Sequence, residues 1–267
     1  MKRIRKIITI ILCITMLLLS VVPSFAAEDK SDDTNYSFLL EQGYPETFLN
    51  KLTEDAMQKL VDEIGDGYVT DIKIDKCYLN EGEIVTLNAI DPNTLTIEFL
   101  SSYVCNKKTK KINSVVITAT WDWIANRPRY RGKDTICVNW NCDVFTFPGG
   151  FYAEDLYRSD SSKDWSTFKT YQTPEKSAQG AISYTTDLKA LKKYVGGTMI
   201  LPLEPVENMY KGTAKSTGLN FEYAHPSNAV SKVSVTAGGK FGLSLEFGSG
   251  VYNTTRALSF KYSKTSS

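Results

Sequence analysis

Hydrophobic and polar residues alternate along most of this 267-residue sequence, and this period of two restricts the chain to β-strands over that length. The alternation begins near Val69, and its longest run ends at Trp121 and Trp123. Side chains at every second position of a strand lie on the same face of a sheet, so each run predicts a strand with one buried face. The tract NKKTKK at residues 106–111 separates two runs and is predicted to form an exposed hairpin tip.

Turn-forming glycines divide the C-terminal region. Gly238-Gly239 and Gly248-Ser249-Gly250 separate three alternating segments within residues 233–262, which predicts a three-stranded antiparallel meander. About ten short strands at this spacing are typical of a single all-β domain. We therefore expect residues 67–267 to form a mainly β domain, an antiparallel β-sandwich or barrel-like sheet.

A shorter region with helical periodicity precedes the strands. Gly43 suits the end of one helix, Pro45 suits the first turn of a second, and Thr53 followed by two acidic residues suits the N-cap of a third. Residues 36–66 are therefore predicted to form a small helical hairpin. A unit of this size cannot bury a core of its own, so it must pack on the following strands or on a partner.

The N-terminus has the three parts of a secretory signal peptide. Four basic residues precede an apolar run at residues 7–22, and Ser24 and Ala26 are small residues at the positions that signal peptidase requires. Sixteen apolar residues are too few to span a bilayer, which takes about twenty. We expect residues 1–26 to be a cleaved signal helix and the polar residues 27–35 to be a flexible lead. The protein is then secreted and extracellular, with no stable membrane anchor.

Removing this segment changes the charge and the cysteine count. Four of the 31 basic residues are lost, which leaves 27 against 30 acidic residues and a net charge of about −3. Nucleic-acid binding domains are strongly basic, so a nucleic-acid partner is not expected. Cys77, Cys105, Cys137 and Cys142 remain, and in an extracellular protein they predict two disulfides of undetermined connectivity. No CxxC pair occurs, so a metal site is not expected. No cofactor is expected either.

His225 is the only histidine, which excludes a zinc site with two histidine ligands. GxSxG, P-loop, GxGxxG and HExxH motifs are all absent, and SxxK at residues 166–169 lacks its companion motifs. No catalytic residue is therefore proposed, and His225 is read as a surface or hydrogen-bonded histidine. A glycan hydrolase needs two carboxylates, and pairs such as Glu154 with Asp155, or Asp160 with Asp164, could supply them.

A segment rich in arginine and aromatic residues gives the candidate ligand-binding site. Guanidinium groups bind phosphate or carboxylate, and aromatic rings stack on sugars, so an anionic surface polymer, a glycan or another protein is a conceivable partner. Two alternatives remain: the arginines pair with acids along a sheet edge, and the first two tryptophans belong to the core. The candidate residues are Trp121, Trp123, Arg127, Arg129, Tyr130, Arg131 and Trp165.

Several short motifs resemble those of exported proteins of Gram-positive bacteria with no assigned activity. They are GYPETFLNKLT at Gly43–Thr53, WDWIANRP at Trp121–Pro128, VNW at Val138–Trp140, AQGAISY at Ala178–Tyr184 and EYAHP at Glu222–Pro226. The resemblance implies export and a shared fold, and it implies no mechanism.

These features favour a secreted, non-catalytic β-rich protein that acts as a cell-surface or extracellular binding module. One alternative is a membrane-active toxin or bacteriocin-like protein, because the C-terminal segments alternate as inserting β-hairpins do. The other alternative is a carboxylate-dependent glycan hydrolase.

Overall fold

The computed structural model describes residues 34–80, 94–123, 133–159, 164–188, 194–226, 233–237, 243–247 and 251–265. Contacts divide the chain into two units, Met1–Thr34 and Asn35–Ser267, and all the strands belong to the second. The predicted signal peptide and the lead as far as residue 33 lie outside the described residues.

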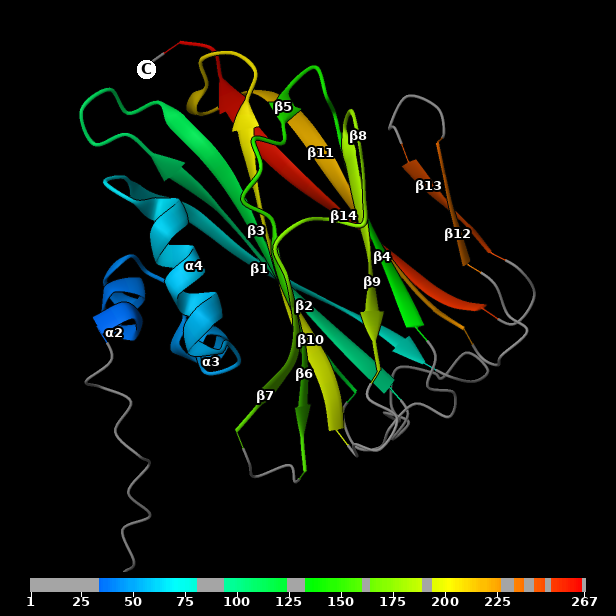
Figure 1. Ribbon diagram of the computed structural model, residues 1–267. Coiled ribbons are helices and arrows are strands. Elements are labelled where there is room, and N and C mark those ends of the chain that lie inside the picture. The colour runs from blue at the N-terminus through cyan, green and yellow to red at the C-terminus, as the bar shows by residue number, and fades with distance from the viewer. Residues whose placement is uncertain are drawn as a thin grey trace, which may run out of the picture. The chain divides into compact units, whose positions relative to one another are not determined.

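Two antiparallel sheets form the body of this unit (Figure 1). The seven-stranded sheet has the order β1 (Tyr68–Asn80), β2 (Thr94–Cys105), β3 (Ile112–Trp123), β10 (Tyr194–Pro205), β6 (Tyr152–Arg158) and β7 (Ser166–Tyr171), and β5 (Phe145–Thr146) pairs with the end of β10. The five-stranded sheet has the order β14 (Val251–Ser263), β11 (Tyr210–Pro226), β4 (Lys133–Trp140), β9 (Ala181–Asp187) and β8 (Lys176–Ala178).

The main core lies between the inner faces of the two sheets. Trp121 from β3, Trp140 from β4 and Phe221 from β11 are among its largest buried side chains. On one side the sheets are linked, because the guanidinium of Arg256 in β14 donates two hydrogen bonds to the carboxylate of Asp75 in β1. The expected mainly β, sandwich-like fold is confirmed.

Three helices precede the sheets: α2 (Thr34–Glu41), α3 (Glu46–Leu49) and α4 (Glu54–Ile64). Gly43 adopts a φ of 91° in the turn after α2, and Pro45 caps α3. The Thr53 side chain accepts a hydrogen bond of 3.2 Å from the backbone N–H of Ala56, which makes it the N-cap of α4 as the sequence predicts.

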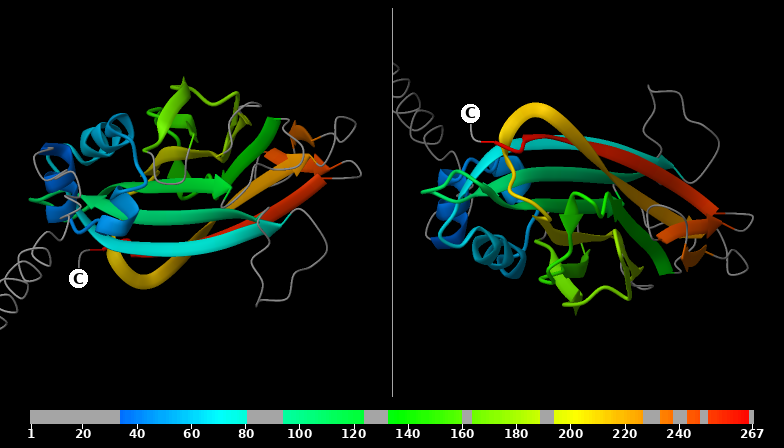
Figure 2. Two further views of the ribbon diagram at one scale, coloured as in Figure 1. Left: turned by 90° about the horizontal axis from the view of Figure 1, so that it is seen from below. Right: turned by 90° about the horizontal axis from the view of Figure 1, so that it is seen from above.

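These helices cover one end of the outer face of the seven-stranded sheet. Leu39, Phe48 and Leu60 from the helices pack against Leu100 and Ile200 from the strands. Figure 2 shows the helices, in blue, gathered at one end of the long strands, with β12 and β13, in orange, at the other end. The helices bury their apolar side on the sheet, as their small size requires.

The C-terminal region differs from the predicted three-stranded meander. β12 (Val233–Ala237) and β13 (Leu243–Phe247) pair with each other as a separate two-stranded sheet, but β14 pairs with β11 instead of β13. The reason is burial, because Leu258, Phe260 and Tyr262 of β14 face the main core. The apolar side of β14, which suggested membrane insertion, is therefore occupied within the fold.

The predicted disulfides are also absent, since Cys77, Cys105, Cys137 and Cys142 are all free. Cys105 pairs across the strands with Tyr68, and Cys77 lies nine residues further along β1. At about 3.3 Å per residue this separation is roughly 30 Å, far beyond the ~7 Å that a disulfide allows between α-carbons. Cys137 is buried on the outer face of β4 against Ala181 and Ala224.

Candidate functional site

The outer face of the seven-stranded sheet changes from apolar to polar along its strands. Strand register places Ile74, Leu100, Thr118, Ile200 and Tyr152 in one row across the sheet. Most of this row is apolar and lies under the helices. Two steps further along each strand, the next row consists of Lys76, Glu98, Thr120, Thr198 and Glu154.

A third row continues this face beyond the helices, and we call the surface that it forms the polar end. Its members are Tyr78, Thr96, Asp122, Gly196 and the buried Leu156. Tyr78 is 55% exposed, and Thr96 and Asp122 are half-buried. Adjacent strands lie about 4.8 Å apart, so Tyr78 and Gly196 are separated by about 14 Å across three strand spacings.

Trp165 covers the Gly196 end of this row. A β-carbon at Gly196 would lie 2.4 Å from the backbone oxygen of Trp121 and 3.2 Å from Cη2 of Trp165, so the indole lies close to this glycine. The guanidinium carbon of Arg158 lies 4.4 Å from the centre of the Trp165 ring and 5.4 Å from that of Tyr194. At these distances both rings attract the guanidinium through cation–π contacts. The stack presents a partly exposed aromatic surface beside Asp122.

Charged groups at the polar end pair with one another. Arg158 lies 3.3 Å from Asp122, and Lys76 lies 3.4 Å from Glu98. Lys51, in the turn after α3, also contacts Glu98. Because Asp122 faces Arg158 and Glu98 faces Lys51 and Lys76, charge alone does not select a strongly charged ligand.

Burial raises the pKa of Asp122 to about 6, against the opposing effects of Arg158 and Lys51. Glu154, in the second row, is fully buried and its pKa is also raised by burial. The hydroxyl groups of Thr53 and Tyr152 donate hydrogen bonds to it at 2.9 Å and 3.0 Å. The N-cap residue of α4 therefore connects the helices to the sheet at the border of the polar end.

The predicted ligand-binding residues fall into three groups. Trp121 and Trp123 are 2% and 0% exposed and belong to the core, as their strand alternation indicated, so a surface ligand does not reach their rings. Trp165 is partly exposed and lies at the polar end. The remaining four, Arg127, Arg129, Tyr130 and Arg131, lie outside the described residues.

Sequence reasoning missed Tyr78, Asp122, Arg158 and Tyr194. They come from β1, β3, β6 and β10, and only strand register brings them together. For Tyr78 the local pattern is misleading, because the residue has the same parity as Ile72 and Ile74 and alternation assigns it to their apolar face. No local signal marked the other three.

The single histidine is part of the core. Nδ1 of His225 lies 2.6 Å from a carboxylate oxygen of Asp134, and the Tyr223 hydroxyl donates to the other oxygen. The ring of Trp123 packs edge-on against the imidazole at 4.9 Å between centroids. His225 and Asp134 are fully buried, so the hydrogen-bonded interpretation of His225 is confirmed and the surface interpretation is not.

The structure gives no support to a hydrolase that uses Glu154 and Asp155. These neighbours in β6 point to opposite faces of the sheet: Glu154 toward the helices and Asp155 toward the inner face, where it accepts a hydrogen bond of 2.7 Å from Tyr171. Paired catalytic carboxylates must flank the same bond. Asp160 lies outside the described residues.

Within the described part of the chain, no group of three His, Cys, Asp or Glu side chains could hold a metal ion.

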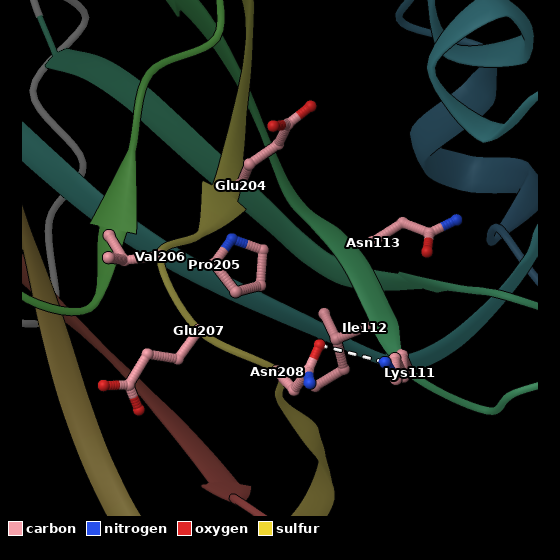
Figure 3. Close-up of a pocket in the computed structure, with 8 residues that line it drawn as sticks. All are labelled: Lys111, Ile112, Asn113, Glu204, Pro205, Val206, Glu207 and Asn208. Carbon is pink, nitrogen blue, oxygen red and sulfur yellow. Dashed lines mark hydrogen bonds between the residues drawn. The ribbon is translucent and has the colours of Figure 1, made fainter.

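A recess lies at the opposite end of β10 from Trp165 (Figure 3). It has a volume of about 540 Å³ and is bordered by the start of β3 and the turn after β10. The Lys111 ammonium donates a 3.0 Å hydrogen bond to the Asn208 side chain, and Glu207 pairs with Lys264. Pro205 and Val206 form one wall, and Val206 is 53% exposed.

No protein family matches this sequence, and no curated protein matches it either. Among solved structures, the chain is similar to the K1 cleaved adhesin domain of Lys-gingipain from Porphyromonas gingivalis W83. The likeness covers 56% of this chain and 96% of that domain, at 15% identity and a TM-score of 0.21. At that TM-score it carries no argument about this protein. No described helix has the length and apolar character needed to cross a membrane.

Proposed function

We propose that this protein is an exported, non-catalytic module that binds a glycan through the polar end of its seven-stranded sheet. It belongs, in this proposal, with the exported proteins of Gram-positive bacteria that its motifs resemble, and its signal peptide is cleaved near Ala26. The first amino acid of the secreted protein tests the export part. N-terminal sequencing that begins at Ala27 is expected, and an intact Met1 would contradict it.

The observation that carries the binding proposal is the row from Tyr78 to Gly196. It has an exposed ring at one end and the Trp165–Arg158 stack at the other, with the hydrogen-bonding groups of Thr96 and Asp122 between them. Flat apolar rings suit the faces of pyranoses, and hydroxyl and carboxylate groups suit their hydroxyls. The ~14 Å span is longer than one sugar ring, which favours an oligosaccharide over a monosaccharide.

The paired charges favour recognition by hydroxyl groups. Among the described residues of this surface, Arg158 and Asp122 neutralise each other, and Glu98 faces Lys51 and Lys76. The surface itself therefore supplies no strong electrostatic attraction for an anionic polymer.

A glycan array and a cell-wall pull-down test the proposal with single substitutions. We expect Trp165→Ala and Tyr78→Ala each to weaken binding about tenfold or more, which corresponds to roughly 1.4 kcal/mol for the loss of one stacking surface. Leu40→Ala is the matched control, because Leu40 is 40% exposed on α2 and lies outside the polar end. Absence of binding to every glycan, or equal binding by all four proteins, would overturn the proposal.

A further inference from the structure

A second recess, which we call the end pocket, lies on the far side of the Pro205–Val206 wall from the recess of Figure 3. It has a volume of about 700 Å³, within the range of small-molecule sites. The turn after β4, strand β5 and the β8–β9 hairpin enclose it. Its lining residues are Trp140, Cys142, Phe145, Thr146, Phe147, Ser177, Ala178, Gln179, Gly180, Pro205 and Val206.

Aromatic side chains fixed by the core line the end pocket. Trp140 and Phe145 are 1% and 0% exposed, and the indole N–H of Trp140 donates a 3.1 Å hydrogen bond to the backbone carbonyl of Phe145. Phe147 is partly exposed and packs edge-on against Trp140, with 6.5 Å between ring centroids. Trp140 and Phe145 therefore form the buried base of the recess, and Phe147, Pro205 and Val206 are the apolar side chains with surface to offer a ligand.

The β8–β9 turn is built to approach these rings closely. Gly180 has a φ of 81°, and a β-carbon there would lie 2.9 Å from the backbone oxygen of Trp140 and 3.2 Å from Cβ of Cys142. The backbone N–H of Trp140 donates to the Gly180 oxygen at 2.8 Å. One wall of the end pocket is thus pinned to the strand that carries Trp140, so the recess is preformed.

The end pocket has no charged side chain among its lining residues. The recess on the other side of Val206 differs, because Lys111, Glu204 and Glu207 line it. Transfer of a charged group into a partly apolar recess without a counter-charge is unfavourable. The hydroxyls of Thr146 and Ser177 and the amide of Gln179 can satisfy a few uncharged polar groups.

We propose that the end pocket is a binding site for a small uncharged ligand that carries a planar apolar ring. The ring lies against Phe147 and Val206, and the uncharged polar groups of the ligand meet Ser177 and Gln179 at the rim. This site is separate from the polar end, because Trp165 and Val206 lie near opposite ends of β10. It therefore does not depend on glycan binding.

A pair of naphthalene dyes tests the ligand class with the full chain. Prodan is neutral, and 8-anilino-1-naphthalenesulfonate is an anion of similar ring size. We expect prodan to bind one site per chain with enhanced fluorescence, and the sulfonate to bind at least about tenfold more weakly. Equal affinity for both dyes, or no saturable prodan binding, would overturn the proposal.

Two variants locate the site. Ser177 is exposed on β8 and lines the end pocket, so Ser177→Trp is expected to fill the recess and weaken prodan binding about tenfold or more. Ser259→Trp places the same side chain at an exposed position on β14, away from the pocket, and is expected to leave binding unchanged. Equal loss in both variants would show that the dye binds elsewhere, and circular dichroism checks that both variants fold.

Cys142 gives a readout that does not depend on the fluorescence of the dye. It is partly exposed and lines the end pocket, whereas Cys77 is partly exposed on β1. Saturating prodan is expected to slow alkylation of Cys142 by iodoacetamide severalfold and to leave Cys77 unaffected. Unchanged alkylation of Cys142, or equal slowing at both cysteines, would place the dye outside the end pocket and contradict the proposal.

Discussion

The imidazole Nδ1 of His225 lies 2.6 Å from a carboxylate oxygen of Asp134, and no part of either side chain is exposed. The same carboxylate also accepts the Tyr223 hydroxyl. One acid on β4 thus satisfies two polar groups of β11 inside the core. This arrangement is a structural crosslink between neighbouring strands.

Asp134→Ala is expected to lower the free energy of unfolding by about 3–5 kcal/mol, because it leaves buried polar groups of His225 and Tyr223 without their acceptor. Urea denaturation measures the change. Asp143→Ala is the control, because Asp143 is an exposed acid in the turn after β4 and its loss should cost less than about 0.5 kcal/mol. A similar small loss for both variants would refute the crosslink.

Gly197 is required by close packing. A β-carbon there would lie 2.2 Å from Cζ2 of Trp121 and 2.6 Å from the backbone oxygen of Glu154. Gly197→Ala is therefore expected to cost about 3 kcal/mol, because the buried indole cannot move aside. Gly218→Ala should change stability by less than about 0.5 kcal/mol, since a β-carbon there meets only a backbone oxygen at 3.5 Å. Thermal or urea unfolding that ranks the two variants equally would contradict this account.

Thr53 joins the helices to the sheet through its hydroxyl, which caps α4 and donates to Glu154. Thr53→Ala is expected to lose about 2 kcal/mol, because the helix loses its cap and the buried carboxylate loses a donor. Thr53→Ser retains the hydroxyl and should lose less than half as much. Chemical denaturation compares the two variants, and equal losses would show that the methyl group, not the hydroxyl, is what matters.

Acid should stabilise the fold through Asp155. Burial raises the pKa of this carboxyl to about 6, although the Asp187 N–H and the Tyr171 hydroxyl donate to it. Its unfolded pKa is about 3.9, so the folded state binds the proton more tightly. This contribution to stability is complete below about pH 4 and is lost as the pH rises through about 6.

Asp155→Asn is therefore expected to flatten the stability profile between pH 4 and pH 7 by about 2 kcal/mol. Urea denaturation at several pH values measures this difference. Asp143→Asn, at an exposed acid, should leave the wild-type profile unchanged. If the free energy of unfolding of Asp155→Asn changes with pH as steeply as that of the wild type, the Asp155 carboxyl titrates at its ordinary pKa.

The free cysteines predict a specific labelling pattern. Iodoacetamide should label the partly exposed Cys77 and Cys142 in the native protein, because Cys105 and Cys137 are buried. Burial also raises the pKa of Cys137 to about 12, which suppresses the reactive thiolate. In urea without a reductant, all four should become labelled. If peptide mass spectrometry finds two of them unlabelled until a reductant is added, the protein contains a disulfide.

Local patterns were sufficient to predict the elements but not their partners. The alternation that ends at Trp123 predicts a strand with its tryptophans in the core, and the Thr53 pattern predicts an N-cap; both are confirmed. The prediction of a three-stranded meander is wrong, because strand pairing depends on which partner buries the apolar face of a strand. Pairing with β11 places the apolar side chains of β14 in the main core. The polar end could not be predicted for a related reason, since Tyr78 and Asp122 share a row only through the register of three strands.

The pairing of β14 with β11 also bears on the order in which the molecule can assemble. Every strand of the seven-stranded sheet, and the helices that cover it, come from residues before 206. The five-stranded sheet gains its outer strand only from residues 251–263, more than a hundred positions after β4. Such distant pairing closes slowly. During synthesis, the helix-covered layer can therefore form early, while the part of its inner face that holds Tyr103 is covered by Phe260 only when the last strand arrives.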